Sequence, residues 1–179
     1  MKRVQPKYGL AILFFAFALV AAACSSDTDD QVAAESDATE EAPPAESLAL
    51  AEIDFTTGTV TIKNEGDAAV DMTGLKICQA PDYGDLPSET LEPGATVSVA
   101  APSTIAADSG EIGIYADDNF GSAASIVSYV EWGESGHQRS TTAIEAGIWS
   151  DGEFVDSADA TILTASAGTA FTGADWTAG

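Results

Sequence analysis

Basic residues are scarce in this sequence. Beyond residue 23 only Lys63, Lys76 and Arg139 remain, against all 29 acidic residues of the chain, so this part has a formal charge of −26. Nucleic-acid binding depends on Lys and Arg displacing phosphate counterions, and three scattered bases cannot build such a surface. An anionic lipid surface is disfavoured for the same reason. We therefore expect no nucleic-acid partner.

The acidity has two interpretations. Solubility, or adaptation to salty surroundings that screen the self-repulsion, explains it without a ligand. Attraction of divalent cations or basic partners is the alternative. We favour the first and keep the second open.

Histidine and cysteine are as scarce as the bases. His137 is the single histidine, and Cys24 and Cys78 are the two cysteines. One histidine and one free thiol cannot supply a zinc site in a single chain. The sequence also has no P-loop, no glycine-rich dinucleotide fingerprint and no N-glycosylation sequon. We therefore expect no cofactor.

Long apolar runs are absent except at the start, where the basic segment "MKRVQPKY" precedes "GLAILFFAFALVAAA". This order is typical of a secretory signal. As a helix the apolar run would span about 22 Å, short of the roughly 30 Å hydrocarbon core, which disfavours a transmembrane helix. The sequence predicts a signal peptide over residues 1–23 that is removed, and an extracytoplasmic protein.

The end of this run, "LVAAAC", resembles the bacterial lipobox, in which small residues precede a cysteine that is lipidated and becomes the new N-terminus. The resemblance implies that Cys24 carries acyl chains such as palmitate and anchors the protein to the extracytoplasmic face of a bacterial membrane. Proteins of this class carry two or three chains, which makes the attachment durable. Ala21 departs from the pattern, which usually has Leu there. Ordinary secretory cleavage beside a chance cysteine is the alternative.

With Cys24 lipidated, Cys78 is the remaining thiol, so an intramolecular disulfide is excluded. An unpaired cysteine in an exported protein is either buried or able to cross-link two molecules. We expect burial and a monomer, with cross-linking through Cys78 as the alternative.

Residues 24–47 have the composition of a flexible linker. They hold eight acids, no base and a single sizeable apolar side chain, Val32, so they cannot bury enough surface to offset their ordering entropy. We predict a disordered acidic linker there, followed by one folded domain over residues 48–179.

The folded part shows short runs of period-two alternation, broken by Gly, Pro, Asn and Asp. In "GTVTIKNEGD", for example, Val60 and Ile62 share one face. Both faces of "ASIVSYVEW" are apolar, which favours a central strand. The segment "TTAIEAGIW" is at most a helical turn. Seven to nine such strands predict an all-β sandwich.

The stretch from Val60 to Val99 resembles the lamin tail domain, an immunoglobulin-like β-sandwich. The matching elements are a strand ending in Asn, a polar turn, an aliphatic-Asp-aliphatic step into Gly, and "L-x-PG" before another strand. They are Asn64, Gly66-Asp67, Val70-Asp71-Met72, Gly74 and Leu91-Glu92-Pro93-Gly94. Leu75 departs from the pattern, where Trp is common. The resemblance implies a fold but little about function, because such domains occur as appendages of surface proteins and share no catalytic set. Together with the lipobox and the linker, it leads us to expect a lipid-anchored, non-enzymatic module that acts in binding or surface organisation.

A catalytic hypothesis rests on "WGESGHQRS". His137 is a candidate base, Ser135 and Ser140 are candidate nucleophiles, and Glu131 and Glu134 could orient the imidazole. The nucleophile elbow G-x-S-x-G is not matched, because the second glycine comes one position early. A turn after a buried strand explains the same residues, and we favour it over a small surface hydrolase.

A calcium hypothesis rests on "ADDNFG", where Asp117, Asp118 and Asn119 offer oxygen ligands. The EF-hand spacing fails, and a turn between strands is the interpretation that we favour. We therefore expect no metal, with a calcium-dependent adhesin as an alternative function.

Aromatic residues gathered on one surface could form a platform for a sugar or a protein. Trp149 lies near a turn in "AGIWSDGEF", so we expect it to be partly exposed. The binding candidates are Trp149, His137 and Arg139, and the expected partner is a protein or glycan at the cell surface.

Overall fold

The computed structural model describes residues 47–166 and 172–179. The described residues all belong to one compact unit. The predicted signal peptide, Cys24 and the acidic linker up to residue 46 lie outside the described residues. In the part of the chain that is described, no helix is long and apolar enough to cross a membrane.

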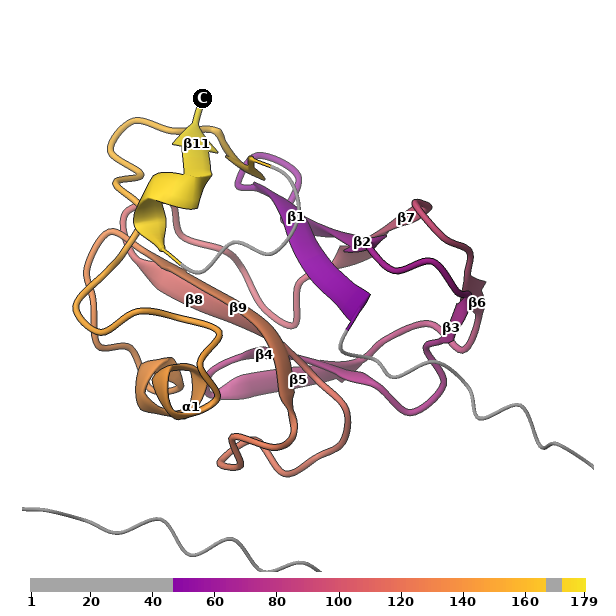
Figure 1. Ribbon diagram of the computed structural model, residues 1–179. Coiled ribbons are helices and arrows are strands. Elements are labelled where there is room, and N and C mark those ends of the chain that lie inside the picture. Colours follow the sequence, from indigo (N-terminus) through magenta and orange to yellow (C-terminus); the bar gives the residue numbers. More distant parts are fainter. Residues whose placement is uncertain (1–46, 167–171) are drawn as a thin grey trace, which may run out of the picture. The chain divides into compact units, whose positions relative to one another are not determined.

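The described residues form an all-β sandwich of the immunoglobulin-like type, as predicted (Figure 1). The first sheet has the order β11-β10-β1-β2-β7 and the second the order β5-β4-β8-β9. The strands of the first sheet are β1 (Leu48–Asp54), β2 (Thr59–Asn64), β7 (Thr96–Ala100), β10 (Ile162–Ala165) and β11 (Trp176–Ala178). Those of the second are β4 (Lys76–Gln79), β5 (Asp82–Asp85), β8 (Gly110–Tyr115) and β9 (Ile126–Trp132).

Four further elements lie outside these two sheets. The strands β3 (Val70–Asp71) and β6 (Thr90–Leu91) pair as a small separate sheet. The helix α1 (Ser140–Glu145) and the 3₁₀ turn η2 (Gly173–Asp175) are short. The described strands number 11, more than the predicted seven to nine, because β3, β6 and β11 are only two or three residues long.

The core lies between the two sheets and follows the predicted alternation. Val60 and Ile62 of β2 are fully buried, and so are Ile112 and Ile114 of β8. A hydrogen bond from the Leu50 backbone N–H to the Ser128 Oγ (3.0 Å) joins the sheets. Burial of this apolar surface is the main driving force for the fold.

Asn64 organises the corner that carries the lamin-tail-like motif. Its buried side chain donates from Nδ2 to the carbonyls of Ala68 (2.8 Å) and Leu91 (2.9 Å), while Oδ1 accepts from the Gly66 N–H (2.9 Å). One amide therefore ties the turn after β2 to β6, and it satisfies its hydrogen-bonding groups inside the protein.

The prediction that residues 124–132 form a central strand was wrong. Among the described strands, β9 pairs only with β8 and is therefore an edge strand of its sheet. Its two apolar faces have another cause: one face packs into the sandwich core, and the segment around α1 covers the other (Figure 1). A parallel bridge between Trp132 and Val155 protects the end of the exposed edge.

Candidate binding site on the outer face of the second sheet

The outer face of the second sheet is the side turned away from the sandwich core. Because side chains alternate along a strand, Glu111, Gly113 and Tyr115 of β8 share this face. Tyr129 of β9 lies opposite Gly113, and Glu131 lies opposite Glu111. On β8 and β9 the face thus carries two carboxyl groups and two tyrosines.

Glu131 is 0% exposed and organises this segment. Its carboxylate accepts hydrogen bonds from four donors. These are the Tyr129 hydroxyl (3.2 Å), the His137 N–H (3.0 Å), the Ser140 hydroxyl (3.0 Å) and the Trp149 Nε1–H (3.1 Å). A buried carboxylate is tolerated only when its oxygens are satisfied in this way.

Glu111 makes a second attachment. Its Oε2 accepts from the Tyr129 hydroxyl (2.8 Å) and from the Arg139 N–H (2.9 Å). Burial raises the pKa of Glu111, and it also raises the pKa of Tyr129, which therefore keeps the hydrogen that it donates. The two carboxyl groups together fix the backbone from His137 to Ser140.

This fixed backbone aims the Arg139 side chain at β5. Its Nη2 donates to the Tyr83 hydroxyl (2.9 Å), and its guanidinium carbon lies 5.9 Å from the centre of the Tyr83 ring. Arg139 therefore links the buried carboxyl groups, through its backbone, to an exposed aromatic residue, through its side chain.

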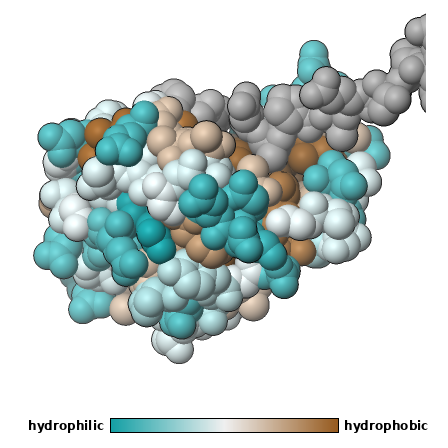
Figure 2. Space-filling model, turned by 90° about the horizontal axis from the view of Figure 1, so that it is seen from below, coloured by the Kyte–Doolittle hydropathy of each residue, from teal (hydrophilic) through white to brown (hydrophobic). Residues whose placement is uncertain are grey.

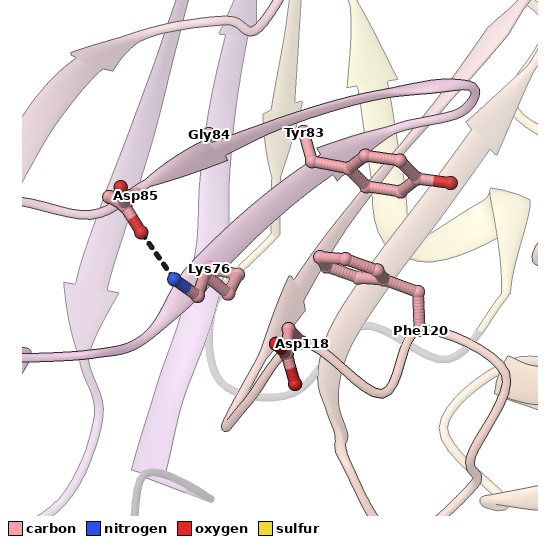
Figure 3. A pocket seen from close by; sticks show the side chains of 6 residues that line it. All are labelled: Lys76, Tyr83, Gly84, Asp85, Asp118 and Phe120. Atoms are coloured by element: carbon pink, nitrogen blue, oxygen red, sulfur yellow. Dashed lines mark hydrogen bonds and ion pairs between the residues drawn. The ribbon is translucent and has the colours of Figure 1, made fainter.

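Tyr83 forms one wall of a pocket. Tyr83 is 45% exposed, and its ring stacks on Phe120 with 4.1 Å between ring centres. Phe120 in turn meets the buried Tyr115 edge-on at 5.1 Å. The pocket has a volume of about 230 Å³ and is lined by Lys76, Tyr83, Gly84, Asp85, Asp118 and Phe120 (Figure 3).

The charged groups of the pocket are arranged opposite the rings. Lys76 forms an ion pair with Asp85, its cross-strand partner, which raises the pKa of Lys76. Asp118 projects from the loop after β8 and also favours the charged form of Lys76. Figure 3 shows the two rings lying one over the other, with this ion pair on the other side of the pocket. The pocket thus combines an apolar wall of Tyr83 and Phe120 with a donor, Lys76, and two acceptors, Asp85 and Asp118.

Cys78 lies under this surface, opposite Tyr83 in the β4–β5 pairing. Its thiol is buried, as we predicted. Burial raises the pKa of Cys78 to about 11, although the neighbouring Arg139 guanidinium acts in the opposite direction. The thiol is therefore protonated at neutral pH, and burial opposes the alternative of cross-linking through it.

His137 meets a serine that the sequence did not single out. Its Nε2 lies 3.2 Å from the Ser109 Oγ, and Ser109 also reaches Glu134 at 3.4 Å. Ser135 is exposed, and the Ser140 hydroxyl is committed to Glu131. Glu131 contacts the His137 backbone N–H, so neither predicted carboxylate makes the expected contact with the imidazole.

The predicted exposure of Trp149 was wrong. Trp149 is 3% exposed, because its ring packs edge-on against Tyr129 at 5.7 Å and its N–H is shared between Glu131 and the Glu153 carbonyl. A position near a turn did not expose it, since the turn folds back over the sheet. Trp149 therefore contributes to stability and has little surface to offer a partner.

The predicted turn between strands at Asp117, Asp118 and Asn119 is confirmed. The Asp117 carboxylate accepts from the Asn119 N–H (2.8 Å), which closes the turn. Across the described residues, no group of three or more His, Cys, Asp or Glu side chains is placed to hold a metal ion.

The pocket itself was missed by sequence reasoning. Tyr83 and Phe120 are 37 positions apart and belong to different segments, so no local pattern joins them. The pairing of β4 with β5 sets Lys76 opposite Asp85. A predicted hairpin over these two strands would have been the one sequence pattern that points to the pocket. On the face shown in Figure 2, hydrophilic residues predominate and apolar surface shows only between them.

Comparison of the chain with models of known protein families gave no match, and comparison with curated protein sequences gave none.

Proposed function

We propose that this protein is a lipid-anchored, extracytoplasmic binding module of the lamin tail type, which acts in recognition or surface organisation. Three features support the proposal: the lipobox-like "LVAAAC" ending at Cys24, the acidic linker that follows it, and the pocket at Tyr83. The pocket is the observation that carries the binding role.

The lamin tail assignment draws support from the Asn64 corner. The motif residues lie together there, and the Asn64 amide joins the polar turn to the Leu91 segment through three hydrogen bonds. Gly74 and Gly94 both adopt positive φ angles, which explains why glycine stands at these motif positions.

The pocket suits binding because its parts are held in place. Phe120 stacks against one side of the Tyr83 ring and Arg139 holds its hydroxyl, so little conformational entropy is lost when a ligand packs on it. Lys76, Tyr83, Gly84 and Asp85 of the lining stand on β4 and β5, and strands position side chains firmly, whereas Asp118 and Phe120 come from the loop after β8.

A surface hydrolase is the second candidate, favoured by the Ser109–His137 contact at 3.2 Å. A serine nucleophile needs a histidine base that is itself oriented by a third group. Here Glu134 contacts the serine, which is the wrong member of the pair for that role. We therefore rank this candidate below a binding module.

Membrane fractionation tests the anchored module. We expect the wild-type chain in the membrane fraction and Cys24→Ala in the soluble extracytoplasmic fraction, with Cys78→Ala as the matched cysteine control that stays with the membrane. Retention of Cys24→Ala in the membrane would contradict the anchor. Turnover of ester or glycan substrates that Ser109→Ala and His137→Ala both abolish would favour the hydrolase instead.

A further inference from the structure

We propose that the Tyr83 pocket binds a neutral sugar ring, a pyranose unit of an uncharged glycan. This inference rests on the proposed binding function and adds the chemical class of the ligand. It depends on the local charge balance, the fixed aromatic wall and the size of the pocket.

The charge balance at the pocket differs from that of the rest of the domain. Residues 48–179 hold 21 acidic residues and only three basic ones. Two of those three, Lys76 and Arg139, lie at Tyr83, where they offset Asp85 and Asp118. The surrounding negative charge repels anionic ligands, and the Lys76 ammonium disfavours a cation inside the pocket. A polar ligand without net charge fits this balance best.

The aromatic wall supplies the apolar half of a sugar site. The C–H bonds on one face of a pyranose ring pack on an aromatic ring, whose π face is electron-rich. The Tyr83 residue is 45% exposed, and its ring stacks on Phe120 with 4.1 Å between the ring centres. The platform is therefore formed before a ligand arrives.

The polar side of the pocket suits hydroxyl groups. A hydroxyl both donates and accepts, so neighbouring sugar hydroxyls can donate to Asp85 or Asp118 and accept from Lys76. An apolar peptide side chain would take these groups out of water without replacing their hydrogen bonds, which is costly. The pocket therefore favours a polyhydroxylated ring over an apolar side chain.

The volume limits the ligand to about one ring. At about 230 Å³ the pocket is smaller than sites for drug-sized ligands, which run from about 300 to 1,000 Å³. We therefore expect weak binding per site and one sugar residue of a longer glycan in the pocket.

Saturation-transfer NMR on the purified full-length chain tests the proposal. The neutral probes are maltotetraose, cellotetraose and chitotetraose, and the charged ones are tri-galacturonate and a glucosamine trimer. We expect transfer to at least one neutral probe and none to the charged ones. Tyr83→Ala should weaken that binding roughly tenfold, the size of a lost aromatic contact.

Two variants control for folding and for exposed aromatic surface in general. Tyr83→Phe keeps the ring and should retain binding. Phe154→Ala removes another exposed aromatic, 41% exposed and not part of the pocket lining, and should also retain binding. Lys76→Met should weaken binding while leaving the aromatic pair in place.

Three results would overturn the proposal: no transfer to any neutral probe, stronger transfer to a charged probe, or equal binding by wild type and Tyr83→Ala. Each is independent of membrane fractionation. If the wild-type chain binds no neutral sugar but its membrane attachment still depends on Cys24, the proposed ligand class is rejected. The proposal of an anchored module then still stands.

Discussion

Glu111 and Glu131 are direct cross-strand partners, and the Tyr129 hydroxyl lies 2.8 Å from one carboxyl group and 3.2 Å from the other. A single hydroxyl hydrogen is thus placed between two buried acids. The other donors to these acids come from the segment after β9, at His137, Arg139, Ser140 and Trp149. The pair is therefore the structural attachment of that segment to the sheet.

Replacing Glu131 tests this attachment. Glu131→Ala leaves several buried donors unsatisfied, and we expect a loss of about 3 kcal/mol or more in the free energy of unfolding, measured by urea denaturation. Glu134→Ala is the matched control. Because Glu134 is exposed and makes only a long contact with Ser109, its loss should stay within about 0.5 kcal/mol. Equal effects of the two substitutions would contradict the role of Glu131.

Glu111 gives the stability a pH dependence. Burial raises its pKa above the ordinary 4.5, and the Glu131 charge adds to this, whereas the Arg139 N–H, Tyr129 and His137 act in the opposite direction. The folded state therefore binds this proton more tightly than the unfolded state does. This contribution to the free energy of unfolding is fully present below the ordinary glutamate pKa. It is lost as the pH rises through the raised pKa of Glu111 in the folded protein.

Comparison of wild type with Glu111→Gln isolates this effect, because the glutamine does not titrate. We expect the difference in free energy of unfolding between the two proteins to shift in favour of the variant as the pH rises from the ordinary glutamate pKa toward neutrality. Urea denaturation at a series of pH values measures it. A difference that does not vary with pH would show that Glu111 does not titrate in this range.

Cys78 should be inert in the folded protein. With a pKa of about 11, about one thiol in ten thousand is ionised at pH 7, and burial adds a steric barrier. We expect negligible labelling by iodoacetamide at neutral pH in buffer and full labelling in concentrated urea, read by mass spectrometry. Rapid native labelling would mean that the Tyr83 surface opens.

Two glycines in the same loop should respond very differently to alanine. Gly133 and Gly136 both have positive φ angles, of 78° and 85°. A Cβ on Gly133 would lie 1.9 Å from the Asp108 carbonyl oxygen, whereas the space around Gly136 is open. Gly136→Ala should cost only the backbone term of about 1–2 kcal/mol. Gly133→Ala should cost clearly more, because the backbone has to move.

Thermal and urea denaturation of both variants measure this contrast. A similar loss for the two would mean that Gly133 does not pack closely against Asp108. The comparison therefore checks the path of the chain as it leaves β9.

The inter-sheet core could be predicted from the sequence, whereas the outer face could not. Val60 and Ile62 lie on the face that their alternation indicates, because one buried face dictates a period of two. In β9 both faces are apolar. This pattern is the same for a strand in the centre of a sheet and for an edge strand whose outer face is covered by a helix. The covering segment supplies its contacts through Trp149 and Ser140, which read locally as turn residues.

The candidate site was only partly foreseen for a similar reason. Arg139 was among the predicted binding residues, and it reaches the pocket wall through Tyr83, 56 positions away. Phe120 comes from the loop after β8, in which the sequence suggested only a calcium site at the three polar residues before it. Contacts between segments so far apart follow from the fold, and composition carries no trace of them.

The sandwich has two separate layers of packing, one between the sheets and one on the outer face of β8 and β9. Tyr83 and Phe120 belong to the second layer, at its margin. Substitutions there leave the residues between the sheets untouched, so a lineage could change them over generations while the fold persists. The pocket lining can thus vary in sequence between related proteins while the core between the sheets is kept.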